Sequence, residues 1–201
     1  DILGDVRGAL LQAIEGRRDF DEFRKGLEPL LKEKGWWGKA QQIDPLTGKP
    51  VEVQLGSARR LRTIYWANVN TAYAAGEWER TWRTRRVLPY VEYLISTALH
   101  KREEHLEWVG TILEVEDPWW DTHWPPNGWG CLCRTAQLSE DEAQGRPHFG
   151  KPPPDFGMAV FVNKRTGEIS RVPIGIDPGW NNNPGKFRMR MAADLIAGKL
   201  D

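Results

Sequence analysis

The segment DPWWDTHWPPNGWGCLCR, from Asp117 to Arg134, constrains the fold of this chain more than any other part of its sequence. It contains four of the eleven tryptophans, both cysteines and one of the four histidines. Its prolines fix φ and its glycines permit turns, so neither a long helix nor a long strand can pass through it. It is therefore predicted to be an ordered loop that serves as an active site, a metal site or a packed structural element. The side chains expected to anchor it by burial are Trp119, Trp120, Trp124 and Trp129.

Four side chains in and near this loop are candidate metal ligands: His105, His123, Cys131 and Cys133. Zinc binds Cys thiolates and His nitrogens in a tetrahedron, and four such ligands would make a closed, structural site. The Cys-x-Cys spacing differs from the Cys-x2-Cys of a standard zinc finger. Two reduced, buried thiols beside hydrogen-bonded histidines are the alternative, since a disulfide across one intervening residue would be strained.

Two catalytic alternatives use the same residues. Cys131 or Cys133 could form a thiol-imidazole pair with His105 or His123, although no third, orienting group is evident. A nuclease or toxin-like enzyme could instead cleave a phosphodiester by acid-base chemistry. Its residues would come from the HKREEH segment, namely His100, Glu103, Glu104 and His105. No phosphate loop, dinucleotide fingerprint or HExxH motif occurs.

Charge and hydropathy narrow the function classes further. The formal net charge is +0 and the pI about 7.1, so global charge does not indicate a nucleic-acid partner. A DNA-binding module remains an alternative because arginines cluster along the 57–86 region. Mean hydropathy is −0.59, and no apolar run approaches the roughly 20 residues that cross a bilayer. No signal peptide is evident, and a first residue other than Met predicts a fragment or a trimmed product.

Hydrophobic spacing predicts two helices in residues 1–34. Gly16 can end the first helix, and Asp19 can cap the second. Residues 35–56 contain the turn signals Asp-Pro and Thr-Gly-Lys-Pro, and they are predicted to form a surface loop held by its two tryptophans.

Residues 57–86 form the longest predicted helix. Two strands are predicted within 88–99 and 110–115, where β-branched and aromatic residues are frequent. Ser139 followed by Glu142 indicates a capped short helix. Residues 158–176 are predicted to form a hairpin that turns at Lys164–Gly167, and residues 186–200 a closing helix with Gly198 near its end.

This order of elements predicts an α+β fold. It comprises N-terminal helices, a long central helix, a small antiparallel sheet with the Trp/Pro/Gly/Cys-rich loop, and a C-terminal hairpin and helix. Three regions are expected. Residues 1–55 form a helical segment and loop, residues 56–150 a core, and residues 151–201 the hairpin, turn and helix.

A wider pattern accompanies the loop. It comprises Arg102, His105, Trp108, Gly110, Asp117 to Trp120, His123 and Pro125 to Arg134. This pattern resembles the phage Mu F-like minor head protein family, which also includes SPP1-type minor head proteins. The segments NVNTAYAAGEWERTWR and IDPGWNNNPG resemble the family too, so the resemblance spans residues 57–185. Leu132 departs from the family, which usually carries Arg between the two cysteines.

The resemblance implies a virion morphogenesis protein, a minor head (capsid) component of a Mu-like tailed phage or prophage. The implied partners are the portal protein and the major capsid protein. Contact with packaged DNA, and an effect on its packaging or ejection, are also implied. Catalytic turnover, a small-molecule substrate and a membrane are not expected. The protein would pass from the host cytoplasm into the virion. Because the resemblance begins after them, the helices of residues 1–34 are expected to dock onto a partner rather than complete the core.

Overall fold

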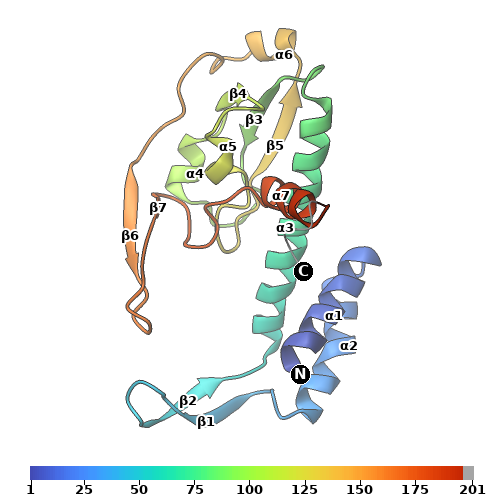
Figure 1. The fold of residues 1–201 in the computed structure, drawn as a ribbon, viewed down its shortest axis with the longest axis vertical. Helices are drawn as coiled ribbons and strands as arrows, with labels where there is room; N and C mark the ends of the chain where they lie inside the picture. Colours follow the sequence, from blue (N-terminus) through green and yellow to red (C-terminus); the bar gives the residue numbers. More distant parts are fainter. Residues whose placement is uncertain (197–201) are drawn as a thin grey trace. The chain divides into compact units, whose positions relative to one another are not determined.

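The computed structural model describes residues 1–196 and divides the chain into two compact units, Asp1–Asn70 (unit 1) and Thr71–Asp201 (unit 2). Helix α3 (Ala58–Thr84) contributes its first half to unit 1 and its second half to unit 2. Helices and small antiparallel sheets alternate along the chain, which confirms the α+β prediction (Figure 1). The predicted helix end at Gly198 lies outside the described residues. No helix within residues 1–196 has the length and apolar character needed to cross a membrane.

Unit 1 begins with the two predicted helices, α1 (Ile2–Glu15) and α2 (Phe20–Glu33). Gly16 is the C-cap of α1, as predicted. The Asp19 carboxylate accepts a hydrogen bond from the Glu22 amide at 2.9 Å, and the Glu22 side chain accepts one from the Asp19 amide at 3.1 Å. This reciprocal capping box satisfies two backbone donors that the first turn of a helix leaves unpaired.

The apolar stripes of α1 and α2 pack against α3 within the chain. The buried cluster of unit 1 comprises Val6, Leu10, Ala13, Phe20, Phe23, Leu27, Leu31, Leu61, Tyr65 and Val69. The Tyr65 hydroxyl also donates a hydrogen bond to the Arg18 carbonyl at 2.6 Å. The expectation that these helices do not complete a core is therefore wrong, and docking onto a partner stays a prediction. The first half of α3, well separated in sequence, supplies the third apolar stripe that the two helices need.

Residues 35–56 form a hairpin rather than the predicted surface loop. Strands β1 (Lys39–Ile43) and β2 (Pro50–Gln54) pair antiparallel along their full length. The predicted turn residues form its tip, where the Thr47 hydroxyl donates to Asp44 at 2.8 Å. Strand pairing prevails because it satisfies backbone amides and carbonyls that an open loop would leave to solvent.

Unit 2 contains a three-stranded antiparallel sheet in the order β4-β3-β5, with β3 in the centre (Figure 1). Its strands are β3 (Tyr90–Leu94), β4 (Ile112–Glu114) and β5 (Arg134–Leu138). The short helices of the unit are α4 (Glu103–Glu107), α5 (Trp120–His123) and α6 (Glu140–Gln144). A hairpin of β6 (Met158–Val162) and β7 (Ile169–Pro173) and the helix α7 (Pro184–Ile196) complete it. The predicted Ser139–Glu142 capping box is confirmed.

Tryptophans form most of the core of unit 2. Trp78, Trp108, Trp120 and Trp124 are almost completely buried. The indole N–H of Trp120 donates to the Glu114 carbonyl at 3.0 Å, and that of Trp124 donates to the Ala74 carbonyl at 3.2 Å. The predicted burial of loop tryptophans is confirmed for these two. It is wrong for Trp129, which is 59% exposed and rests against the edge of Trp180.

Candidate metal centre

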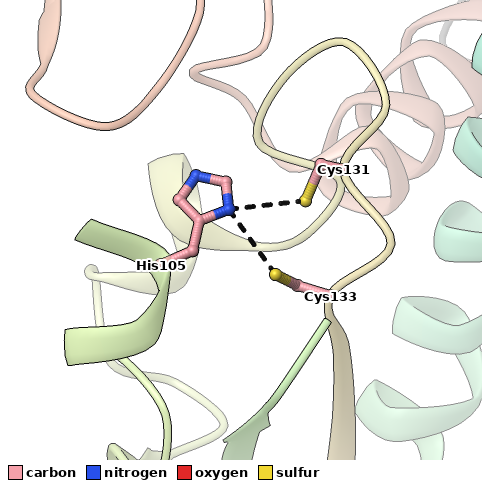
Figure 2. A group of neighbouring side chains, drawn as sticks. All are labelled: His105, Cys131 and Cys133. Atoms are coloured by element: carbon pink, nitrogen blue, oxygen red, sulfur yellow. Dashed lines mark hydrogen bonds between the residues drawn. The ribbon is translucent and has the colours of Figure 1, made fainter. Parts of the chain in front are cut away.

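Three of the four predicted ligands lie together in unit 2. His105 projects from α4, and Cys131 and Cys133 lie at the end of the loop that leads into β5. His105 Nδ1 is 3.5 Å from the Cys133 sulfur and 3.7 Å from the Cys131 sulfur (Figure 2). The three residues are 3%, 7% and 8% exposed, in the order His105, Cys131 and Cys133. This buried group could hold a metal ion.

The loop turns back on itself so that both sulfurs face α4. Its Pro125–Pro126 peptide bond is cis. The Cys131 amide then donates to the Gly128 carbonyl at 3.1 Å, which closes a tight turn. One residue further on, the Leu132 carbonyl accepts a bond from Thr97, so the loop is tied to the chain that follows β3.

The His105 ring is held in one orientation. Its Nε2 atom lies 2.8 Å from the Gly175 carbonyl oxygen, and a carbonyl can only accept, so Nε2 carries the proton. In the neutral ring the lone pair is then on Nδ1, which faces the two sulfurs (Figure 2). Trp108 stacks on the ring, with centroids 4.8 Å apart and planes 23° from parallel. The imidazole is therefore preorganised as a ligand.

Asp177 connects α4 to the loop. Its carboxylate accepts two hydrogen bonds from the Arg102 guanidinium, at 2.9 and 2.6 Å, and a third from the Trp129 amide at 2.8 Å. Burial alone would raise the pKa of Asp177, but these bonds outweigh burial and lower it. A Cβ on Gly128 would lie 2.5 Å from the carboxylate, so a larger residue there would displace the Asp177–Arg102 pair.

The two thiols are electrostatically coupled. Their mutual hydrogen bond, supported by His105, lowers the pKa of Cys131 against the effect of burial. The same bond, together with burial, raises the pKa of Cys133. The hydroxyls of Tyr93 and Ser96 oppose this rise in the pKa of Cys133. Burial, followed by the charges of the two sulfurs, raises the pKa of Tyr93.

His123 does not join this group. Its ring stacks on Trp119 at 4.3 Å, and its Nδ1 lies 2.8 Å from the Thr122 hydroxyl and 3.2 Å from the Trp119 carbonyl. It lines a cavity of about 340 Å³ with Trp108, Trp119, the whole segment 153–158 and residues 173–174. Burial lowers the pKa of His123 to about 4. The structure thus brings together His105, Cys131 and Cys133, and places His123 among aromatic rings instead.

Sequence reasoning did not single out Gly175 or Asp177 as part of the site. Both lie on the segment after β7, 70 residues or more from His105 and Arg102 in the chain. The signal that could have found Asp177 is the IDPGWNNNPG segment, which begins at Ile176, directly after Gly175. It was recognised as part of the motif but had no assigned contact.

Comparison with known proteins places this chain in a family. The profile described as Phage Mu protein F like protein matches residues 4–136. The chain belongs to this family. The match begins in α1, so the N-terminal helices are as much a part of the family pattern as the loop.

Two relatives extend the similarity over most of the chain. Protein F of Escherichia phage Mu, named as a candidate capsid assembly protein, is 34% identical over 209 aligned residues, covering 92% of this chain and 45% of its own length. The F protein of the Mu-like prophage FluMu of Haemophilus influenzae is 38% identical over 199 residues, covering 92% of this chain and 47% of its own length. The chain thus spans about half the length of these relatives. No solved structure matches it significantly.

Proposed function

We propose that this chain acts in capsid assembly, as a minor head component of a Mu-like tailed phage or prophage. The observation that carries the proposal is the 34% identity, over 92% of the chain, to a candidate capsid assembly protein. The portal protein and the major capsid protein are the proposed partners. Residence in the virion, contact with packaged DNA and an effect on packaging or ejection follow from such a position.

The state of His105 supports a non-enzymatic role. One ring nitrogen bonds to the Gly175 carbonyl and the other faces two sulfurs, so neither is directed to a substrate. The nuclease alternative, built on His100, Glu103, Glu104 and His105, loses its central acid or base. The thiol-imidazole alternative places its nucleophile in a buried position.

The arginines of residues 57–86, in and just after α3, give limited support to the DNA-binding alternative. Arg60 donates to the Gln54 and Leu55 carbonyls at 2.6 and 2.7 Å. Arg62 lies over the Phe20 ring, and Arg85 pairs with Glu116 and stacks on Trp82. These three guanidinium groups serve internal contacts, so they do not form a continuous phosphate-binding face.

The β6–β7 hairpin is the surface that we propose contacts the head. Its exposed apolar residues are Met158, Val160, Phe161, Val162 and Ile169. A two-stranded hairpin is marginally stable alone, and contiguous exposed apolar residues mark interaction sites. A shell or portal surface that buries these side chains would stabilise the hairpin.

Purified heads of the phage or prophage that encodes this chain provide the test. The chain should copurify with heads, and Val160→Glu should abolish its incorporation while the protein stays folded by circular dichroism. Val51→Glu is a matched control, because Val51 is also an exposed valine on a two-stranded hairpin. Absence of the chain from both proheads and mature heads would refute the role. Incorporation of Val160→Glu at the normal level would refute the proposed surface.

For the metal centre, we propose a structural zinc ion held by His105, Cys131 and Cys133. Thiolate and imidazole ligands suit zinc. Zn–N and Zn–S bonds of about 2.0 and 2.3 Å give a tetrahedral N–S edge of about 3.5 Å. The separations of 3.5 and 3.7 Å match that edge. Among residues 1–196 no fourth His, Cys, Asp or Glu joins the group, so the closed set of four such ligands expected from the sequence is not formed.

Elemental analysis of the chain refolded with zinc tests this site. About one zinc per chain is expected, and chelation should lower the melting temperature, since a metal that binds the folded chain and not the unfolded chain stabilises the fold. Cys131→Ser, Cys133→Ser and His105→Ala should lose the metal. His123→Ala is the control and should keep it. Less than about one zinc per four wild-type chains would leave only two buried thiols.

A further inference from the structure

We infer that Gly175 and Asp177 are positioning residues of the metal centre, and that metal binding and the order of segment 174–180 depend on each other. This inference rests on the proposed zinc site. The segment contributes no ligand atom, yet it contacts both pieces of the chain that do. Ligating histidines generally donate their second N–H to a carbonyl or carboxylate, and loss of that partner weakens metal affinity.

Gly175 makes the first of these contacts. Its carbonyl accepts the Nε2–H bond of His105 at 2.8 Å, which leaves Nδ1 to face the sulfurs. The backbone reaches this position only because the residue has no side chain. A Cβ would lie 2.8 Å from the Trp108 ring and 2.9 Å from the Glu104 Cβ, and φ is +94°. Trp108 stacks on His105, so displacing Trp108 would also displace the ligand.

Asp177 makes the second contact. Its carboxylate binds Arg102 at the start of α4 and the Trp129 amide in the cysteine loop. Its own amide donates to the Asn127 carbonyl at 3.0 Å. The residue thus joins the segment that carries His105 to the segment that carries both cysteines. Loss of these bonds would let the two sets of ligands separate.

Thermodynamic linkage makes the dependence between zinc binding and the order of segment 174–180 reciprocal. If the ordered segment favours the arrangement that binds zinc, zinc must favour the ordered segment by the same free energy. The amides of Ile176, Asp177 and Trp180 report on that order, because each donates a backbone hydrogen bond: Ile176 to Pro173, Asp177 to Asn127 in the cysteine loop, and Trp180 to Asp177. Zinc should therefore slow hydrogen exchange at residues that do not touch it.

The decisive comparison is between two glycines of this segment. Gly175 and Gly179 both have positive φ, but a Cβ on Gly179 would meet nothing within 4 Å. In the full chain, Gly175→Ala should bind zinc about 10- to 100-fold more weakly in competition with a chromophoric chelator. Gly179→Ala should bind it nearly as the wild type does. Cobalt substituted at the site gives a second readout, because a displaced His105 alters the d–d bands, whereas a weaker fold only lowers occupancy.

Asp177→Asn provides a separate test, with Glu116→Gln as its control. Glu116 also pairs with an arginine of unit 2, Arg85, at 3.0 Å. Asp177→Asn should weaken zinc binding about 10-fold and speed exchange at Ile176 and Trp180, and Glu116→Gln should do neither. If the wild-type chain binds no zinc, both the proposed site and this inference are overturned. Tight zinc binding that is unchanged in Gly175→Ala and Asp177→Asn, or exchange in 174–180 that ignores zinc, would overturn this inference alone.

Discussion

Unit 1 closes its core with aliphatic and aromatic side chains on three helices, whereas unit 2 closes its core with tryptophans, a buried histidine and two thiols. In unit 1 the contacts are apolar and follow helical spacing. In unit 2 polar atoms are buried as well: Asn127 is fully buried, accepts a bond from the Tyr93 hydroxyl at 2.9 Å and donates to the Thr122 carbonyl at 3.3 Å.

This difference affects which substitutions each unit tolerates in its core. Apolar cores accept substitutions that preserve volume, whereas a buried polar group that loses its partner destabilises the fold by its full desolvation penalty. We therefore expect unit 1 to respond to side-chain volume, and unit 2 to respond also to hydrogen bonding, pH and metal. Four predictions test that distinction, from the largest expected effect to the smallest.

Trp124→Ala should have the largest effect, a loss of roughly 3–5 kcal/mol in the free energy of unfolding. The indole is buried, packs edge-on against Trp78 at 4.8 Å and donates to the Ala74 carbonyl. Urea denaturation measures the loss. Hydrogen exchange should quicken in residues 71–196 and not in α1 and α2. Equal acceleration in both units would contradict the independence of their cores.

Leu31→Ala should destabilise unit 1 by roughly 2–4 kcal/mol, because the side chain is fully buried and the substitution leaves a cavity. Leu31→Met, which nearly preserves volume, is the matched variant and should lose less than about 1.5 kcal/mol. Both are measured by urea denaturation. Zinc affinity should be unchanged in each, since no residue of unit 1 belongs to the metal group. A large change in affinity would show that the cores are coupled.

Acidification should destabilise unit 2 through His123. The folded pKa of about 4 lies below the ordinary value of 6.5, chiefly because of burial, and Asp155 and His105 also act on the ring. The unfolded chain therefore binds a proton that the folded chain does not, and stability falls as pH drops from about 6.5 towards 4. After allowance for partial exposure, the loss between pH 7 and pH 5 is about 1 kcal/mol. In the metal-free protein, His123→Gln should flatten this dependence. If stability depends on pH as steeply in His123→Gln as in the wild type, other groups cause that dependence.

The two capping boxes give the smallest and most evenly matched comparison. Asp19→Ala should destabilise unit 1 by about 1 kcal/mol, because α2 has 14 residues and packs into the core. Ser139→Ala removes the same motif from α6, which has five residues, and local fraying should limit the loss to about 0.5 kcal/mol. Thermal unfolding of the two variants measures both effects. A larger effect for Ser139→Ala would mean that α6 stabilises its unit more than its length suggests.

Features encoded by neighbours in the chain could be predicted from the sequence. The cap residues Asp19 and Ser139, the end of α1 at Gly16 and the turn of the β6–β7 hairpin all follow from side chains acting on nearby backbone. The family resemblance was likewise readable, since its motif is dense and local. Even the misjudged 35–56 region had its turn residues identified correctly, and only the pairing of the flanking strands was missed.

Features that depend on distant segments were decided by the tertiary structure. Composition and spacing gave no reason to prefer any one of His105, His123, Cys131 and Cys133 as a metal ligand. In the structure His123 stacks on Trp119 and lies outside the group. The partner of the α1 and α2 stripes and the contacts of Gly175 and Asp177 arise from chain separations of about 30 to 75 residues. Sequence by itself therefore determined the local elements, the loop and its ligand chemistry. Which ligands converge depended on long-range packing, because a side chain's partners are set by the whole buried core and not by its neighbours in sequence.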